Sequence, residues 1–220
     1  SYETGFFGVY KKCDETAFIW YERAAKQGYA HAQYKLCIFY ANARGVGKCA
    51  KTSTIWCERA AKQGFVLAQH NMGCCYYFGK GVDKCQKTAC AWYEKAATRG
   101  NVDAQYSIGY CYARGSGVDK CKETALSWFK RAAMQGHAKA QFNTGVYYDL
   151  GLGVEKCAKS SAFWYKKAAK QGHAKAQYNL GNGYSCGYGV SECRKTAVIW
   201  YEKAAKQGLA KAQSNLGACY

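Results

Sequence analysis

Residues 196–208 read TAVIWYEKAAKQG, and closely related stretches recur along the chain at a step of 36 residues. Within this stretch Ala197, Trp200, Tyr201 and Ala204 fall at i, i+3, i+4 and i+7, which is the apolar spacing of an amphipathic helix. The closing glycine stands where a left-handed residue commonly ends a helix. The stretch therefore predicts a helix that ends at its glycine.

The tryptophans mark the period, because each lies 36 residues after the one before it. They are Trp20, Trp56, Trp92, Trp128, Trp164 and Trp200. Cysteine, glycine and glutamine keep the same step at other positions. A fixed period of about 20 to 50 residues is typical of a repeat architecture in which each unit is one supersecondary element. The chain is therefore predicted to be a tandem array.

A second helix is predicted in each unit. In the fifth unit residues 174–184 place Leu180, Gly181 and Tyr184 on one helical face, and a Gly-x-Gly-Val loop follows at 187–190. Clustered glycines break a helix and permit positive φ. We name the first helix of each unit helix A and the second helix B. Each unit is thus predicted to be an antiparallel helix hairpin with a longer connector to the next.

Glycine in the middle of a helix costs about 1 kcal/mol relative to alanine, yet helix B carries one in five units. These are Gly73, Gly109, Gly145, Gly181 and Gly217. We expect a neighbouring helix to approach closely there, with the tryptophans filling the space between adjacent hairpins. Stacked hairpins would then share one continuous core.

The units largely follow the motif W-Y-x-[KR]-A-A-x-[QR]-G-x-[AV]-x-A-Q-x-x-[LIMT]-G-x-x-Y, and then G-x-G-V. This pattern resembles the Sel-one-like repeat (SLR) family of the tetratricopeptide-repeat-like superfamily over essentially the whole chain. Two departures are the absence of proline after Gly-Val and a cysteine where the family often has aspartate. The resemblance implies an all-α, right-handed α-solenoid of six tandem antiparallel helix hairpins with helix A on the concave side.

The resemblance also implies a role as scaffold or adaptor that binds a protein or peptide through the helix A face, and not as an enzyme. Some cysteine-rich relatives are linked to β-lactam binding and hydrolysis. No stretch of this chain approaches the ~18 continuous apolar residues of a membrane span.

The repeat boundaries are predicted from the periodic cysteines. Six repeats are expected at 13–48, 49–84, 85–120, 121–156, 157–192 and 193–220, the last truncated. Residues 1–12 echo the end of a preceding helix B and its connector, because Tyr2, Gly5 and Gly8 resemble Tyr76, Gly79 and Gly81. We therefore expect the chain to be a fragment of a longer array.

Charge is the unusual feature of the composition, since 32 basic and 14 acidic residues give a net charge of +18. Two helix A positions, opposite the Ala/Trp stripe on a helical wheel, carry much of it. The first, here called the basic row, is Arg23, Arg59, Lys95, Arg131, Lys167 and Lys203. The second holds Lys26, Lys62, Lys170 and Lys206.

Three interpretations of this charge remain open. The basic row could capture an acidic protein or peptide, or it could bind nucleic acid or another polyanion. It could also be a solvated face, partly neutralised by i, i+4 pairs. Those pairs would be Glu22 with Lys26, Glu58 with Lys62 and Glu202 with Lys206. Because the aromatic residues follow the core period, stacking on bases is disfavoured and we rank the protein partner above nucleic acid.

Beside the basic row runs a position that varies between repeats, here called the apolar row. It comprises Ile19, Ile55, Ala91, Ser127, Phe163 and Ile199. The residue before each joins it, namely Phe18, Thr54, Cys90, Leu126, Ala162 and Val198. Such a strip either suits a peptide with acidic flanks or packs on the next helix. The candidate partner-binding residues are Ile19, Arg23, Lys26, Ile55, Arg59, Lys62, Lys95, Leu126, Arg131, Phe163, Lys167, Lys170, Ile199, Lys203 and Lys206.

Six of the fourteen cysteines are periodic and are expected at the N-terminus of helix A, each beside a basic residue. They are Cys13, Cys49, Cys85, Cys121, Cys157 and Cys193. A helix N-terminus with a neighbouring cation favours the reactive thiolate. The alternative, which we favour, is that cysteine serves as a small half-buried apolar residue.

Disulfides between equivalent cysteines are excluded, because adjacent helix pairs lie on the order of 9 to 10 Å apart and a bridge needs Cα atoms within ~7 Å. The pairs Cys75 with Cys85 and Cys111 with Cys121 remain open. Secreted cysteine-rich members of the resembling family carry a C-x7-C pair where this chain has Ala25 and Gln33. That difference indicates a reduced, intracellular protein.

Catalytic and metal signals are thin, and we predict no cofactor. The chain has no C-x2-C, and its four histidines show no i, i+4 pairing. His137 and His173 hold the turn position before helix B, which favours a loop role. The Gly-x-Gly-Val loops lack the preceding strand of a nucleotide fingerprint.

Overall fold

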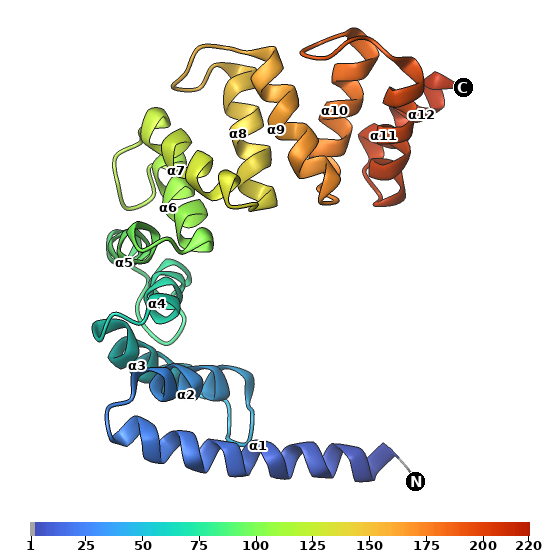
Figure 1. Cartoon of the computed structure of the whole chain (residues 1–220). Coiled ribbons are helices and arrows are strands. Elements are labelled where there is room, and N and C mark those ends of the chain that lie inside the picture. The colour runs from blue at the N-terminus through green and yellow to red at the C-terminus, as the bar shows by residue number, and fades with distance from the viewer. Residues whose placement is uncertain (1–2) are drawn as a thin grey trace. The chain divides into compact units, whose positions relative to one another are not determined.

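The computed structural model describes residues 3–220, with side chains from Cys13 onward. All regular elements in that range are α-helices, and no strand is present among these residues. The helices follow one another as antiparallel pairs (Figure 1). They are α1 (Glu3–Lys26), α2 (Ala30–Asn42), α3 (Ala50–Lys62), α4 (Val66–Phe78), α5 (Gln86–Thr98), α6 (Val102–Arg114), α7 (Lys122–Met134), α8 (Ala138–Leu150), α9 (Ala158–Lys170), α10 (Ala174–Cys186), α11 (Arg194–Lys206) and α12 (Ala210–Cys219). The predicted all-α array of hairpins is confirmed.

The periodic glycine ends helix A as predicted. At the end of α3, Gly64 adopts φ +85°. Its N–H donates to the carbonyl oxygen of Ala61 at 2.9 Å, and the N–H of Phe65 donates to that of Ala60 at 3.0 Å. This is the paired hydrogen-bond pattern that a left-handed C′ residue permits. The turn into helix B therefore takes only a few residues.

The connector after helix B is held by its own hairpin. Gly79 ends α4 at φ +69°, and the N–H of Cys85 returns to the carbonyl oxygen of Tyr76 at 2.9 Å. Between them the connector crosses α3, where the Thr54 hydroxyl donates to the carbonyl oxygen of Lys80 at 3.0 Å. The connector thus covers one flank of helix A.

Mid-helix glycine in helix B permits close approach by the next helix A. A Cβ built on Gly181 would lie 2.7 Å from ring atoms of Tyr201, a distance that real Cβ atoms essentially never show. Gly73, Gly109 and Gly145 meet an aromatic ring of the next helix A in the same way. Gly217 departs from the expectation, because no later helix A follows it in this chain and nothing lies within 4 Å of such a Cβ.

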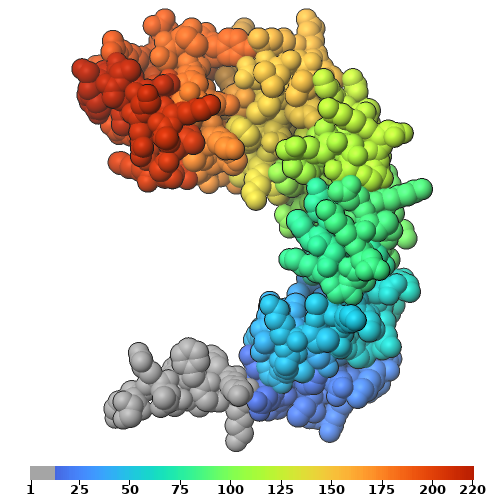
Figure 2. All heavy atoms as spheres, turned by 180° about the vertical axis from the view of Figure 1, so that it is seen from behind, coloured from blue at the N-terminus to red at the C-terminus, as the bar shows by residue number. Residues whose placement is uncertain are grey.

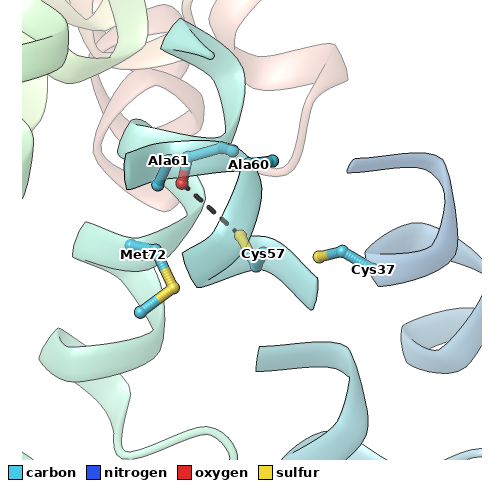
Figure 3. Close-up of a cluster of buried hydrophobic side chains, with 6 residues drawn as sticks. Cys37, Cys57, Ala60, Ala61 and Met72 are labelled. Atoms are coloured by element: carbon cyan, nitrogen blue, oxygen red, sulfur yellow. Dashed lines mark hydrogen bonds between the residues drawn. The ribbon is translucent and has the colours of Figure 1, made fainter. Parts of the chain in front are cut away.

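Trp56, Trp92 and Trp200 each add to the core of the preceding hairpin. Figure 3 shows Cys57 and Met72 of one hairpin beside Cys37 of the one before, and the Cys57 thiol donates to the carbonyl oxygen of Ala68 at 3.4 Å. Trp92 of the next hairpin packs against this cluster. Trp20 has no earlier hairpin to cover it and is 61% exposed, so our expectation of a space-filling role is wrong at that position.

The helices form two compact units, which are described separately. The first reaches to Ala104 and includes Ser116–Asp119, and the second comprises Gln105–Gly115 and Lys120–Tyr220. Within each unit successive hairpins are in direct contact in the space-filling view of Figure 2. Among the described helices none has the length and apolar character needed to cross a bilayer.

The start of the chain differs from the expectation. Cys13 lies inside α1, which is helical from Glu3, whereas we expected the end of a preceding helix B and its connector over residues 1–12 and a helix start at the cysteine. Residues 1 and 2 lie outside the described part. In later repeats the connector is held by the helix A that precedes it, and the described chain has no such helix before residue 13. The other five periodic cysteines do occupy the N-cap.

Candidate protein-binding face

The basic row is exposed in every repeat, and each cation stacks on the tryptophan three residues before it on the same helix. The separations from cation to ring centroid are 4.9 Å for Arg23–Trp20, 4.6 Å for Arg59–Trp56, 4.7 Å for Lys95–Trp92, 4.6 Å for Arg131–Trp128, 5.2 Å for Lys167–Trp164 and 4.5 Å for Lys203–Trp200. All lie within the ~6 Å range of a cation–π interaction. Six cations are therefore held in one orientation relative to their helices.

We did not anticipate this stacking, although the sequence carries its signal. Residues three apart lie on the same side of a helix, and every repeat reads W-x-x-[KR]. The stacking bears on nucleic-acid binding. One ring face of each tryptophan is taken by its own cation, and Trp92 and Trp200 also pack against core clusters. These rings are poorly placed to stack on bases.

The second basic position is only partly neutralised. Lys26 pairs with Glu22 at 3.1 Å and Lys62 with Glu58 at 2.8 Å, as predicted. The predicted pair of Glu202 with Lys206 is not formed, and Glu202 instead accepts a hydrogen bond from the Tyr220 hydroxyl at 3.3 Å. Exposed ion pairs of this kind contribute little stability. The charge of the face therefore comes from the basic row together with Lys170 and Lys206.

The apolar row is also exposed. The exposed fractions of its large side chains are 49% for Ile19, 51% for Ile55, 52% for Phe163 and 50% for Ile199. Each lies four residues before a member of the basic row, so the two are neighbours on the helix surface. Lys167 contacts the apolar row directly as well as its own tryptophan, because its ammonium lies 4.7 Å from the Phe163 ring centroid and 5.2 Å from that of Trp164. We call the two rows together the helix A face.

The position before the apolar row does not belong to this face. Leu126, one of the candidate partner-binding residues, is only 6% exposed and packs in a core cluster with Leu152 and Val154. Thr54 is likewise buried and bonds to the connector at Lys80. This row faces the connector of its own hairpin. The prediction that Leu126 contacts a partner is therefore wrong.

Four periodic cysteines at N-caps have a lowered thiol pKa, namely Cys49, Cys85, Cys157 and Cys193. Thr52 donates its hydroxyl hydrogen bond to the Cys49 thiol at 3.1 Å, and this bond is the main cause that lowers the pKa of Cys49. Thr88 does the same to Cys85 at 3.1 Å. The dominant cause is thus a hydroxyl three residues on, and not the preceding lysine that the sequence suggested.

The remaining cysteine questions have simple answers. Cys75 and Cys85 are free thiols, and so is Cys121, which excludes both of the disulfides left open above. Across residues 13–220 no three His, Cys, Asp or Glu side chains gather in a group that could hold a metal ion.

The two turn histidines have a structural role. The Nδ1 of His137 accepts the N–H of Ala140 at 3.1 Å, and that of His173 accepts the N–H of Ala176 at 3.3 Å. Burial lowers the pKa of His173, which favours the neutral ring that can accept this bond. Both histidines therefore cap helix B, in agreement with the predicted loop role.

The Sel1 repeat matches the chain six times, at residues 1–29, 30–65, 66–101, 102–137, 138–173 and 174–209. These matches begin at helix B, whereas our boundaries begin at helix A. The difference is one of phase within the same period, and the domain boundaries stay a prediction.

Solved structures agree with this match, whereas a comparison with curated proteins found none. A protective antigen of uropathogenic Escherichia coli with an SLR fold is 36% identical, with a TM-score of 0.89 over 90% of this chain. The chain spans 43% of that antigen's length. A Sel1 repeat protein from Oxalobacter formigenes is 34% identical, with a TM-score of 0.78 over 87% of this chain and 78% of its own.

A Sel1 repeat protein from Klebsiella pneumoniae, 19% identical with a TM-score of 0.52, shares the fold over 90% of this chain and 97% of its own. The fold is that of a repeat scaffold rather than a catalytic type, and the family's members commonly bind other proteins. The chain belongs to the Sel1 repeat family.

Proposed function

We propose that this chain is a scaffold that holds an acidic protein segment along the helix A face. The observation that carries the proposal is the pairing of an exposed apolar-row residue with a stacked cation four residues later. Ile19 with Arg23, Ile55 with Arg59 and Ile199 with Lys203 are examples. The same two positions recur on each helix A of both units. Within each unit, successive helices could therefore contact a partner through the same pair of positions.

Support comes from the physical character of the two rows. Side chains about half exposed on a regular scaffold offer apolar area to a partner. The stacked cations lose less conformational freedom on binding than free lysines or arginines would, because their orientation is already restricted. The net charge of +18 would attract an acidic partner over long range.

The intracellular location stays a prediction.

The runner-up function is binding of nucleic acid or another polyanion, which the same net charge would favour. The stacked tryptophans argue against it, because base recognition in single strands relies on open aromatic faces. The experiment below separates the two possibilities.

The test is capture from nuclease-treated lysate with the chain as bait, followed by titration of the purified captured protein. One variant changes the basic row to Glu, and six charge reversals take the net charge from +18 to +6. A control with the same net charge changes six exposed lysines outside the helix A face. They are Lys48, Lys84, Lys120, Lys139, Lys175 and Lys211. A third variant changes Ile19, Ile55, Phe163 and Ile199 to Ser.

We expect the basic-row and apolar-row variants to bind the purified partner at least tenfold more weakly than the parent, and the charge-matched control to retain it. Equal loss in the basic-row variant and in the control would reduce the interaction to net charge and contradict the proposal. Capture only when nuclease is omitted would show that the chain binds nucleic acid. Equal binding by all variants would show that the partner binds a surface other than the helix A face.

A further inference from the structure

A small cavity of about 130 Å³ lies within the second unit, between α8, α9, α10 and the connector that follows α10. Its lining contains both polar and apolar side chains. The lining residues used below are Asp149, Ser161, Ala162, Leu180, Asn182 and Tyr188. Because this part of the chain is a regular repeat, each of these positions can be compared with its equivalents in other hairpins.

The comparison shows that four of the polar residues that line this cavity replace apolar residues of the repeat before. Asp149, Ser161, Asn182 and Tyr188 all line it. One repeat earlier the same four positions hold Ala113, Ala125, Val146 and Leu152. The period of the scaffold therefore does not require polar groups here. They come from α8, α9, α10 and the connector that follows α10, and they meet only when two successive hairpins pack together.

Two of these groups lack a well-formed hydrogen bond. The Ser161 Oγ and the Tyr188 hydroxyl have no partner at hydrogen-bond geometry within the described residues, and Ser161 is 1% exposed. The polar neighbour of the Ser161 Oγ is the Tyr165 hydroxyl, whose pKa it lowers against the stronger effect of burial. Ser53, at the equivalent position of the second repeat, donates to the carbonyl oxygen of Cys37 at 2.8 Å. An unsatisfied buried hydroxyl costs roughly 1–3 kcal/mol. Two in one cavity point to a ligand that completes them.

The Asp149 carboxylate is held by one hydrogen bond but has capacity to accept more. Tyr165 donates its hydroxyl to Oδ2 of Asp149 at 3.2 Å, and burial followed by the charge of Asp149 raises the pKa of Tyr165, so this hydroxyl remains a donor. A carboxylate has about four acceptor sites. The Oδ1 of Asn182 already accepts from the Tyr201 hydroxyl at 2.8 Å and from Asn215 at 3.1 Å. Asp149 therefore has the acceptor capacity that a ligand could use.

We propose that this cavity binds a primary ammonium group carried on a short aliphatic chain. An ammonium has three N–H donors, and the lining offers three acceptors in Asp149, Ser161 and Tyr188. Asp149 is the charged residue of the lining, so the cavity favours a cation. Lys156 lies over the Tyr188 ring, 5.6 Å from its centroid, and is not part of the lining.

The apolar part of the lining and the size fit the rest of such a ligand. Leu180 and Ala162 present hydrocarbon to the cavity. An engineered cavity of about 150 Å³ accepts benzene, so roughly five or six non-hydrogen atoms fit here. The ammonium could belong to a free small amine or to the end of a lysine side chain of a partner. The site is independent of the helix A face.

The test uses n-butylammonium as probe, titrated at neutral pH and followed by protein NMR shifts of the second unit. We expect saturable binding that weakens at least tenfold in Asp149→Asn and severalfold in Ser161→Ala. We also expect 1-butanol and butyrate to bind at least tenfold more weakly than the cation. Glu155→Gln, which makes the same charge change at an exposed connector position, should bind as the parent does.

Folding is controlled within the same experiment. Ser161→Ala introduces the residue that Ala89, Ala125 and Ala197 hold at this position in other repeats, so the variant should fold. Helical circular dichroism would verify it. Absence of saturation with the parent protein, or equal weakening by Asp149→Asn and Glu155→Gln, would overturn the proposal.

A second probe distinguishes the sources. Competition by Nα-acetyl-lysine methylamide would identify a lysine side chain as a ligand, whereas binding of butylammonium alone would identify a free amine. Either result is compatible with the proposed chemistry and is read separately from any result on the helix A face.

Discussion

Arg99 donates a hydrogen bond to the carbonyl oxygen of Gly64, at a repeat position that holds glutamine in all five other units. Two repeats later, Gln171 makes the equivalent bond to Gly136 at 2.8 Å and also donates to Oε1 of Gln141 at 2.8 Å. The guanidinium of Arg99 makes only the first of these two bonds. The Oε1 of Gln69 is consequently buried without a hydrogen-bond partner.

Arg99→Gln is expected to stabilise the protein. The new amide can donate to both Gly64 and Gln69, as Gln171 does to its two partners. Satisfying a buried acceptor contributes on the order of 1 kcal/mol. We expect the free energy of unfolding, measured by urea denaturation, to rise by about that amount. The reverse change, Gln171→Arg, should lower it similarly, and a destabilised Arg99→Gln variant would refute this account.

Gly181→Ala and Gly217→Ala should have opposite effects. At Gly181 the added methyl group meets the Tyr201 ring, and overpacking of this kind costs about 1–3 kcal/mol. At Gly217 the space is open, so the higher helix propensity of alanine should stabilise α12 by up to ~1 kcal/mol. Thermal denaturation of both variants checks the signs. Equal destabilisation would show that helix backbone effects, and not the neighbouring ring, explain the glycine at Gly181.

Features that follow the repeat period could be predicted from the sequence, because one physical requirement recurs six times. The glycine that ends helix A and the close approach at Gly181 are of this kind. The sequence could not tell that Leu126 is buried whereas Phe163 is exposed, because both positions vary between repeats and lie on adjacent flanks of helix A. The path of the connector decides which flank is covered. Because the connector is not helical, its path cannot be inferred from the spacing of apolar residues.

The cavity illustrates a second limit. Asp149, Ser161 and Tyr188 stand at positions that vary between repeats, on α8, on α9 and in the connector. One sequence gives no reason to group them. Their meeting depends on how α8, α9 and α10 pack. The stacked Trp–cation pairs are the converse case, because their spacing was visible in the sequence.

The thiol of Cys49 is expected to react faster at neutral pH than that of Cys57. Hydrogen bonding to Thr52 lowers the pKa of Cys49, whereas the neighbouring Cys37 thiol and burial raise that of Cys57. Reaction proceeds through the thiolate. Alkylation by iodoacetamide as a function of pH, with each site followed by peptide mass spectrometry, measures both.

Thr52→Val tests the cause of that difference. Valine keeps the shape of threonine but cannot donate, so the pKa of Cys49 should rise and its alkylation near pH 7 should slow severalfold. Cys85, whose hydroxyl partner Thr88 is untouched, is the internal reference. An unchanged rate at Cys49 relative to Cys85 would assign the lowered pKa to the helix N-terminus instead.

The same tryptophan substitution should have very different costs in different repeats. Trp164 is 8% exposed and Trp20 is 61% exposed, although both occupy the same repeat position and stack on a cation of their own helix. Burial of a large aromatic side chain makes its truncation to alanine cost about 3–5 kcal/mol. We therefore expect Trp164→Ala to lower the free energy of unfolding by that amount and Trp20→Ala by under about 1 kcal/mol, the value of an exposed cation–π pair. Equal losses in urea denaturation would mean that the tryptophan acts through its own helix and not through the preceding hairpin.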